Sequence, residues 1–274
     1  MEPGTNQHRL GLFIAEASGT AIFLTAIFFT AIFHSDNLTV AIGVGGGLFI
    51  AITAFGKETG GHFNPAVSTG YFCCILKERR KYLGNYIILI VAQVIGGLFA
   101  GLILFIVSDH IEPVLLPDRN NIHGAVIDEI LFTFIFLLVI YCVKSRNVSH
   151  TNDGMLGALT VSMTLSLTVV YGGKLSGACY NPAVGIAINL WSAFVNFDTY
   201  YADYLYIYIF CPILGGLLSG LVVKYFLDLK IKNSLMRSAW VESKDELNRM
   251  ENEKEEYIPP QNIKKCELDE TNNA

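Results

Sequence analysis

The sequence predicts an all-α membrane protein with six transmembrane helices and two re-entrant half-helices in an inverted repeat. Of its 274 residues, 52% are hydrophobic, and the mean hydropathy is +0.45. Six apolar runs are long enough to cross a bilayer, which takes about 20 residues. The tripeptide Asn-Pro-Ala occurs twice, each time before an apolar stretch too short to cross. Together these observations exclude an ordinary soluble domain.

The six predicted spans are apolar and poor in charge. They cover residues 10–33, 38–56, 83–107, 124–143, 154–171 and 204–226. We therefore predict a short N-terminus at 1–9 and a channel domain at 10–228, with a first repeat at 10–107 and a second repeat at 123–228. The acidic tail at 229–274 is predicted to be partly disordered and helical near 241–256.

Each Asn-Pro-Ala tripeptide predicts the start of a helix. Asn favours the N-cap, and Pro is tolerated at the first helical position, where its missing N–H would have had no partner. The apolar stretches Pro65 to Leu76 and Pro182 to Val195 are shorter than the roughly 20 residues that a span needs. They are therefore predicted to be half-helices that begin inside the membrane.

The two halves of the chain repeat. Asn64 recurs as Asn181, Gly96-Gly97 recurs as Gly215-Gly216, and Glu16 recurs as Glu129, at separations between 113 and 119 residues. Because each half has three spans, the second half enters the membrane from the opposite side, and the half-helices point at each other. Lys and Arg gather at one set of loop ends, which places both termini in the cytoplasm.

The segments before the half-helices are non-helical backbone at membrane depth, which is tolerated only where it is buried or lines a wet cavity. We expect their carbonyls to line a pore and the two Asn side chains to offer amide N–H donors at its centre; the alternative is that each Asn only caps its helix. The expected carbonyls are those of Gly60, Gly61, His62, Phe63, Gly177, Ala178, Cys179 and Tyr180.

Three acids lie inside predicted spans: Asp128, and the two residues at corresponding positions of the repeats, Glu16 and Glu129. Charged groups at this depth need partners, so we interpret the two Glu residues as structural carboxylates, with a proton relay as the alternative. His62 is interpreted as a residue that lines or braces the pore; the alternative is a pH gate. The cysteines lack paired or metal-ligand spacing, and we find no catalytic set or phosphate-binding loop, so we predict no enzyme activity, metal or cofactor.

Six spans, two inverted halves and paired Asn-Pro-Ala loops resemble the aquaporin (major intrinsic protein) family over about residues 8–228. His62 before the first tripeptide and Glu16 with Glu129 support the resemblance. It implies a homotetramer with one pore in each subunit and no cofactor. The matching pore residues are Asn64, Pro65, Ala66, Asn181, Pro182 and Ala183.

The resemblance also places a selectivity filter, and here the sequence departs from the family. The four filter positions fall on Val44, Val169, Ala178 and Val184, all apolar, whereas water-selective members typically have an aromatic residue, His, a small residue and Arg. A similar Asn-Pro-Ala-Val occurs in plant vacuolar members. The Asp typical of glycerol-conducting members is replaced by Gly185. We expect an opening wider and less polar than that of a strict water channel.

The predicted function is passive conduction of water and small neutral solutes such as hydrogen peroxide, ammonia, urea and, as a further candidate, glycerol, with exclusion of protons and ions. The expected partners are the solutes, the bilayer and further copies of the chain, not nucleic acid. The membrane is a plasma membrane or a vacuolar-type internal membrane. The alternatives are a secondary transporter, which also uses inverted repeats, and a junction or scaffold protein that acts through its tail.

Overall fold

The computed structural model describes residues 5–33, 36–108, 115–145 and 148–256, and this part of the chain is helical without strands. Six helical segments are long and apolar enough to cross a membrane. They are α1 (Asn6–Phe33), α2 (Asn37–Thr59), α4 (Arg79–Ser108), α5 (Ile122–Lys144), α6 (Gly154–Gly172) and the part Leu205–Leu227 of α8 (Leu205–Glu256). The predicted all-α membrane fold is confirmed.

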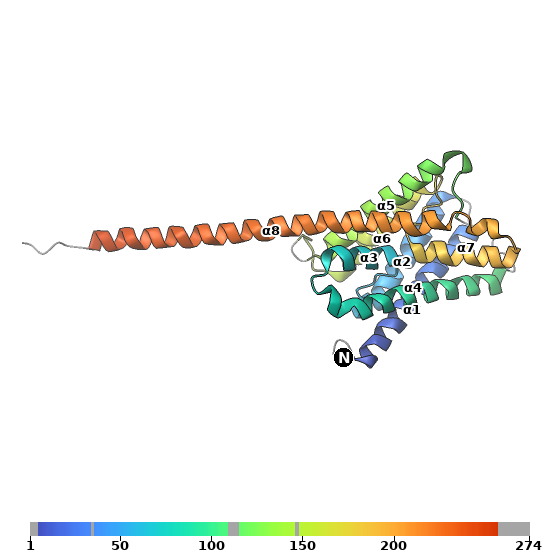
Figure 1. The fold of residues 1–274 in the computed structure, drawn as a ribbon, viewed down its shortest axis with the longest axis horizontal. Coiled ribbons are helices and arrows are strands. Elements are labelled where there is room, and N and C mark those ends of the chain that lie inside the picture. The colour runs from blue at the N-terminus through green and yellow to red at the C-terminus, as the bar shows by residue number, and fades with distance from the viewer. Residues whose placement is uncertain (1–4, 34–35, 109–114, 146–147, 257–274) are drawn as a thin grey trace, which may run out of the picture. The chain divides into compact units, whose positions relative to one another are not determined.

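The predicted half-helices are also present. The first is α3 (Pro65–Gly70), which continues as one π-helical turn over Tyr71–Ile75, and the second is α7 (Pro182–Asn196). They approach each other from opposite ends of the helix bundle (Figure 1). Neither is long enough to cross a bilayer by itself.

Three helix boundaries differ by four residues or more from the sequence-based expectation, one of them the start of α4 at Arg79 rather than at Leu83. Helix α1 begins at Asn6 rather than at Leu10, and Thr5 accepts a hydrogen bond from the His8 N–H in its first turn. Helix α8 continues past Phe226 to Glu256, so the prediction of a tail helix only near 241–256 was too short. The sequence from 221 to 258 contains no Gly or Pro, so nothing in it interrupts the helical hydrogen bonds.

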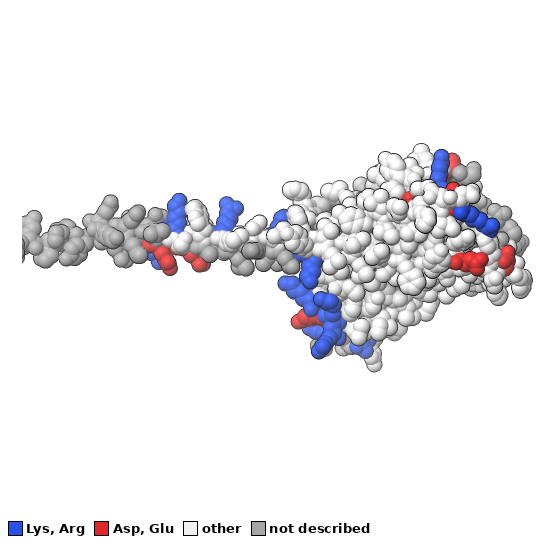
Figure 2. Space-filling view, turned by 45° about the horizontal axis from the view of Figure 1, so that its top comes forward, with Lys and Arg blue, Asp and Glu red and all other residues white. Residues whose placement is uncertain are grey.

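The chain divides into two units, Met1–Leu227 and Asp228–Ala274. The first contains all six spanning segments and both half-helices. The second contains the rest of α8, and the predicted disorder beyond it, at 257–274, lies outside the described residues. In Figure 2 the first unit shows a wide uncharged surface between Lys, Arg, Asp and Glu residues at its two ends, as expected for a protein that spans a bilayer.

Glycine pairs let the half-helices pack closely against the long helices. A β-carbon built at Gly97 of α4 would lie 3.1 Å from the backbone oxygen of Ala183 in α7, and one built at Gly216 of α8 would lie 2.7 Å from that of Ala66 in α3. Each half of the chain therefore supports the half-helix of the other half. Such close approach of backbones is how small residues stabilise helix packing in membranes.

Candidate functional site

The tips of the two half-helices meet through their asparagines. Asn64 Oδ1 accepts a hydrogen bond from the Ala66 N–H at 2.8 Å, and Asn181 Oδ1 accepts one from the Ala183 N–H at 2.9 Å. The amide nitrogens reach across: Asn64 Nδ2 donates to the Tyr180 carbonyl and Asn181 Nδ2 donates to the Phe63 carbonyl, both at 2.9 Å. Because an amide has two N–H groups, each Asn keeps one further donor. Together, Asn64 and Asn181 are called the asparagine pair below.

The residues just before the asparagine pair have unusual backbone conformations. Phe63 has a φ of 48° and Tyr180 a φ of 50°, in the left-handed region that non-glycine residues seldom adopt. Both side chains are fully buried. Both residues precede the helix N-caps, so their backbone N–H groups need acceptors outside the helices that follow.

The two buried carboxylates supply those acceptors. Glu16 of α1 accepts a hydrogen bond from the Phe63 N–H at 2.6 Å. Glu129 of α5 accepts bonds from the N–H groups of Cys179 and Tyr180, both at 2.8 Å. Through these hydrogen bonds, Glu16 and Glu129 each hold one loop in the conformation that presents its Asn.

Each carboxylate belongs to a buried polar cluster that the sequence reasoning only partly anticipated. Gln93 Nε2 donates to Glu16 at 2.7 Å and to Ser68 Oγ at 2.8 Å, and Ser68 Oγ lies 3.0 Å from His62 Nδ1. This contact braces His62. Gln93 is a polar residue in the middle of an apolar run, and that position was a usable signal.

In the second cluster, Ser176 Oγ lies 2.6 Å from a carboxylate oxygen of Asp128 and of Glu129. Tyr180 contributes through its hydroxyl, which donates to Asp128 at 3.2 Å. Ser176 gave no distinct sequence signal, because a serine in a loop is usually solvated.

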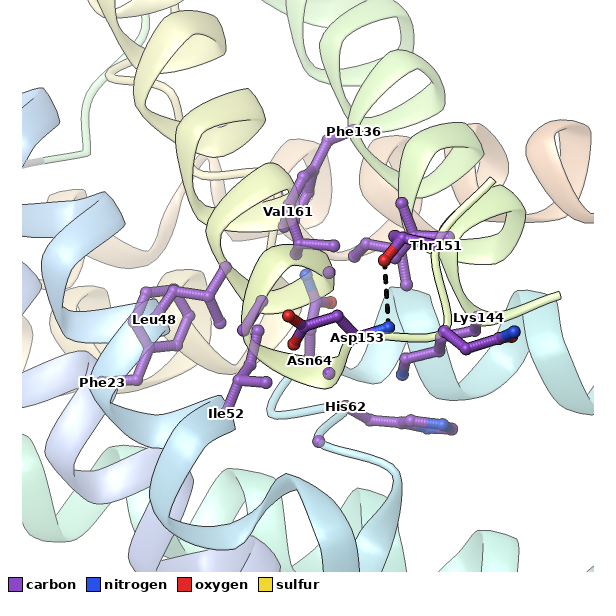
Figure 3. Close-up of a pocket in the computed structure, with 17 residues that line it drawn as sticks. Phe23, Leu48, Ile52, His62, Asn64, Phe136, Lys144, Thr151, Asp153 and Val161 are labelled. Atoms are coloured by element: carbon purple, nitrogen blue, oxygen red, sulfur yellow. Dashed lines mark hydrogen bonds between the residues drawn. The ribbon is translucent and has the colours of Figure 1, made fainter. Parts of the chain in front are cut away.

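A large cavity lies on one side of the asparagine pair. Its volume is about 520 Å³, and it is called the vestibule below. Apolar side chains of α1 and α2, including Phe23, Leu48 and Ile52, form one wall, and Lys144 and Thr151 lie on the opposite side (Figure 3). The predicted residues Gly61, His62 and Asn64 line it, whereas the sequence reasoning missed Lys144 and the segment 151–154.

A much smaller cavity lies on the other side. Its volume is about 40 Å³, and it is called the narrow cavity. It shares Phe23, Asn64 and Phe136 with the vestibule, so the two adjoin at the level of the asparagine pair. All four predicted filter residues line it: Val44, Val169, Ala178 and Val184. Leu115, from the connection between α4 and α5, also lines it and is only 2% exposed.

The remaining predicted site residues fall into two groups. Gly177, Cys179, Tyr180 and Asn181 line the narrow cavity, whereas Gly60 and Phe63 line neither cavity. Pro65, Ala66, Pro182 and Ala183 are buried at the starts of the half-helices. They shape the site without forming its wall.

Comparison with known proteins agrees with this architecture. The family model described as major intrinsic protein matches residues 5–223. The chain belongs to the major intrinsic protein family. It is therefore a multi-pass membrane channel for water or small solutes and a passive conduit rather than an enzyme.

Relatives of this major intrinsic protein occur in bacteria and in plants. "Glycerol uptake facilitator protein-like 6" of Lactiplantibacillus plantarum is 31% identical over 219 residues, which cover 77% of this chain and 92% of that protein. A "Probable aquaporin TIP-type" of Medicago truncatula is 29% identical over 178 residues, covering 64% and 66% of the two chains. This match is consistent with the predicted resemblance to plant vacuolar members.

A solved structure shows the same fold. The X-ray structure of the aquaglyceroporin from Plasmodium falciparum aligns with a TM-score of 0.71 at 21% sequence identity, covering 81% of this chain and 99% of that one.

Proposed function

We propose that this major intrinsic protein conducts water and small neutral solutes such as hydrogen peroxide, ammonia and urea, with glycerol as a further candidate, and excludes protons and ions. The observation that carries the proposal is the asparagine pair, held between the vestibule and the narrow cavity with one amide N–H of each residue left for a passing molecule. Solutes then pass along the path from one cavity to the other.

Proton exclusion follows from the two half-helices. Their N-termini carry positive partial charge and face each other at the asparagine pair. A water molecule that accepts hydrogen bonds from both amides must turn its own hydrogens outward, so it cannot pass a proton along the file.

Ion exclusion follows from the narrow cavity. Its lining in the described part of the chain contains no Lys, Arg, Asp or Glu, and its filter positions are Val44, Val169, Ala178 and Val184. An ion that entered would lose hydration without gaining equivalent contacts. Small neutral molecules lose far less, which supports passage of water, peroxide, ammonia and urea.

The Asp that is typical of glycerol-conducting relatives would not fit at the position of Gly185. A β-carbon built at Gly185 would lie 2.5 Å from Tyr208 Cβ, so a larger residue there requires Tyr208 to move. The name of the bacterial relative nevertheless keeps glycerol among the candidates.

We further propose that both termini are cytoplasmic, because the predicted topology places the basic cluster at 77–81 on the same side as Lys144, which lines the vestibule. The name of the plant relative supports a vacuolar-type membrane, with the plasma membrane as the alternative. As is typical of the family, the proposed assembly is a homotetramer with one pore in each subunit.

Osmotic swelling of vesicles that contain the purified protein tests the proposal. Water, urea, hydrogen peroxide and glycerol fluxes are compared for the wild type, Val184→Arg and the apolar control Val184→Leu. We expect wild-type fluxes above those of empty vesicles, and a loss of solute flux relative to water in Val184→Arg only, because a cation and its donors then occupy the narrow cavity. No water flux from an inserted, assembled sample would reject the channel, and equal solute flux in Val184→Arg would reject the filter assignment.

The same vesicles separate the alternatives. A channel gives a flux that rises linearly with solute concentration, whereas a secondary transporter saturates and couples to an ion gradient. Removal of residues 241–274 leaves the permeability of a channel intact, but it abolishes the activity of a scaffold that works through its tail.

A further inference from the structure

We propose that residues 228–244 of α8 bind anionic lipid headgroups, with the apolar side of the helix in the interface of the bilayer that holds the channel. The first observation is a row of exposed apolar side chains along one face of this segment. Leu229 is 40% exposed, Met236 54% and Trp240 62%. Their spacings of seven and four residues place them on one face of the helix.

Basic side chains run directly beside this apolar row. Lys230, Arg237 and Lys244 are exposed and seven residues apart, so they form a second row parallel to the first. The two rows are in contact, since Lys244 Nζ lies 5.2 Å from the centroid of the Trp240 ring. The aliphatic part of Lys244 and the Trp240 ring are apolar, whereas the ammonium group at the end of Lys244 is charged. Such a pair suits the boundary between acyl chains and headgroups.

Acidic side chains lie on the opposite side of the helix at the C-terminal end of the segment. Glu242, Asp245 and Glu246 are exposed and lie more than about 100° from Trp240 round the helix axis. In Figure 2, most of the Lys and Arg side chains on the described part of this helix project from one side and the acidic ones from the other. The helix therefore offers apolar and basic groups on one side. A partner that matches this side must itself combine apolar groups with negative charge.

An anionic bilayer fits these features better than a second copy of the helix. A parallel pair that used the same apolar row would bring the basic rows of both copies to one seam, where like charges repel. The segment follows the span Leu205–Leu227 directly, so its first basic residue is within a Debye length of the headgroups. Contact along its whole length requires the bound segment to lie along the membrane surface, so binding must turn the chain away from the direction of the span at the boundary between the two units, Leu227–Asp228.

Trp240 reports on this contact directly. The chain has two tryptophans, Trp191 and Trp240. The variant Trp240→Phe retains only Trp191, so subtracting its emission spectrum from that of the full-length wild type gives the emission of Trp240. The protein is reconstituted in phosphatidylcholine vesicles with or without phosphatidylserine, each containing acyl-brominated phosphatidylcholine as a quencher. We expect Trp240 emission to shift to shorter wavelength and to be quenched only when phosphatidylserine is present, with partial reversal by high salt.

Charge variants give the matched comparison. The triple variant Lys230→Gln, Arg237→Gln and Lys244→Gln should show the emission seen in neutral vesicles. The control Glu242→Gln, Asp245→Asn and Glu246→Gln, on the opposite side of the helix, should keep the shift. Water flux in the same vesicles verifies that each variant is assembled.

Three outcomes would overturn the proposal. The first is Trp240 emission that is unaffected by phosphatidylserine, which would leave an acidic soluble protein as the partner to seek. The second is an unchanged shift in the triple basic variant. The third is a shift that follows the protein-to-lipid ratio rather than the phosphatidylserine content, which would indicate pairing between copies.

Discussion

Replacing Asn181 by Asp tests whether the asparagine pair holds the half-helix tips together. An Asp keeps the oxygen that accepts the Ala183 N–H, and Asp is as good an N-cap as Asn. Its second oxygen, however, replaces the Nδ2 that donates to the Phe63 carbonyl at 2.9 Å. The substitution therefore removes one buried hydrogen bond and leaves the helix cap in place.

The size of the effect follows from the burial of that carbonyl. Phe63 is fully buried, and a buried acceptor without a partner costs about 1–3 kcal/mol. For a chain of this length that lowers the Tm by about 2–12 °C. Asn181→Ala also loses the cap, which adds about 0.5–2 kcal/mol, so it should be the less stable variant. Asn64→Asp should match Asn181→Asp, because Asn64 Nδ2 makes the same 2.9 Å bond to Tyr180.

Two assays measure the outcome. Thermal denaturation in detergent gives the order of stabilities. The control is Asn121→Asp, because Asn121 is an exposed N-cap whose side-chain oxygen accepts a hydrogen bond from the Gly124 N–H at 3.0 Å. Ion current across planar bilayers tests selectivity: an acid between the half-helix N-termini should admit cations that the wild type excludes. An Asn181→Asp protein that is as stable as the wild type and still impermeable to cations would refute the reasoning.

Three further predictions concern the carboxylates, the glycine contacts and the narrow cavity. Glu129→Gln should lower the Tm more than Glu16→Gln, because Glu129 accepts two loop N–H bonds and Glu16 one; equal shifts would contradict this. Gly216→Ala should reduce the yield of folded protein in size-exclusion chromatography, since its β-carbon would lie 2.7 Å from a backbone oxygen, whereas Gly46→Ala meets nothing within 4 Å and should behave as the wild type. Leu115→Ala should raise glycerol flux relative to water flux in vesicles by enlarging the narrow cavity, and an unchanged ratio would show that Leu115 does not limit passage.

Much of the fold could be predicted from local sequence because the bilayer restricts the choice of structure. A membrane-spanning segment must satisfy its backbone hydrogen bonds internally, so apolar length translates directly into helices. Asn followed by Pro fixed the starts of α3 and α7 for a similar reason, since both residues act on the first turn of their own helix. The end of α8 was misjudged because loss of hydrophobicity marks the end of a span, not the end of a helix.

The wall of the candidate pore was less predictable. Lys144, the last residue of α5, lines the vestibule, and Leu115 lines the narrow cavity from the connection between α4 and α5; no local pattern specifies either placement. The contact of Ser176 with Asp128 and Glu129 joins residues almost 50 positions apart. Such contacts depend on how whole helices pack against one another, and neither hydropathy nor residue spacing predicts that packing.

The sequence by itself determined the number of spans, their inverted order and the place where each half-helix begins, because these depend on apolar length, parity and capping. Only the tertiary structure decided that each asparagine donates to the carbonyl of the opposite loop and that the path narrows from about 520 Å³ to about 40 Å³ beyond the pair. The reason is that a hydrogen bond across 116 residues and the volume between five helices are properties of how the elements pack, not of any one of them.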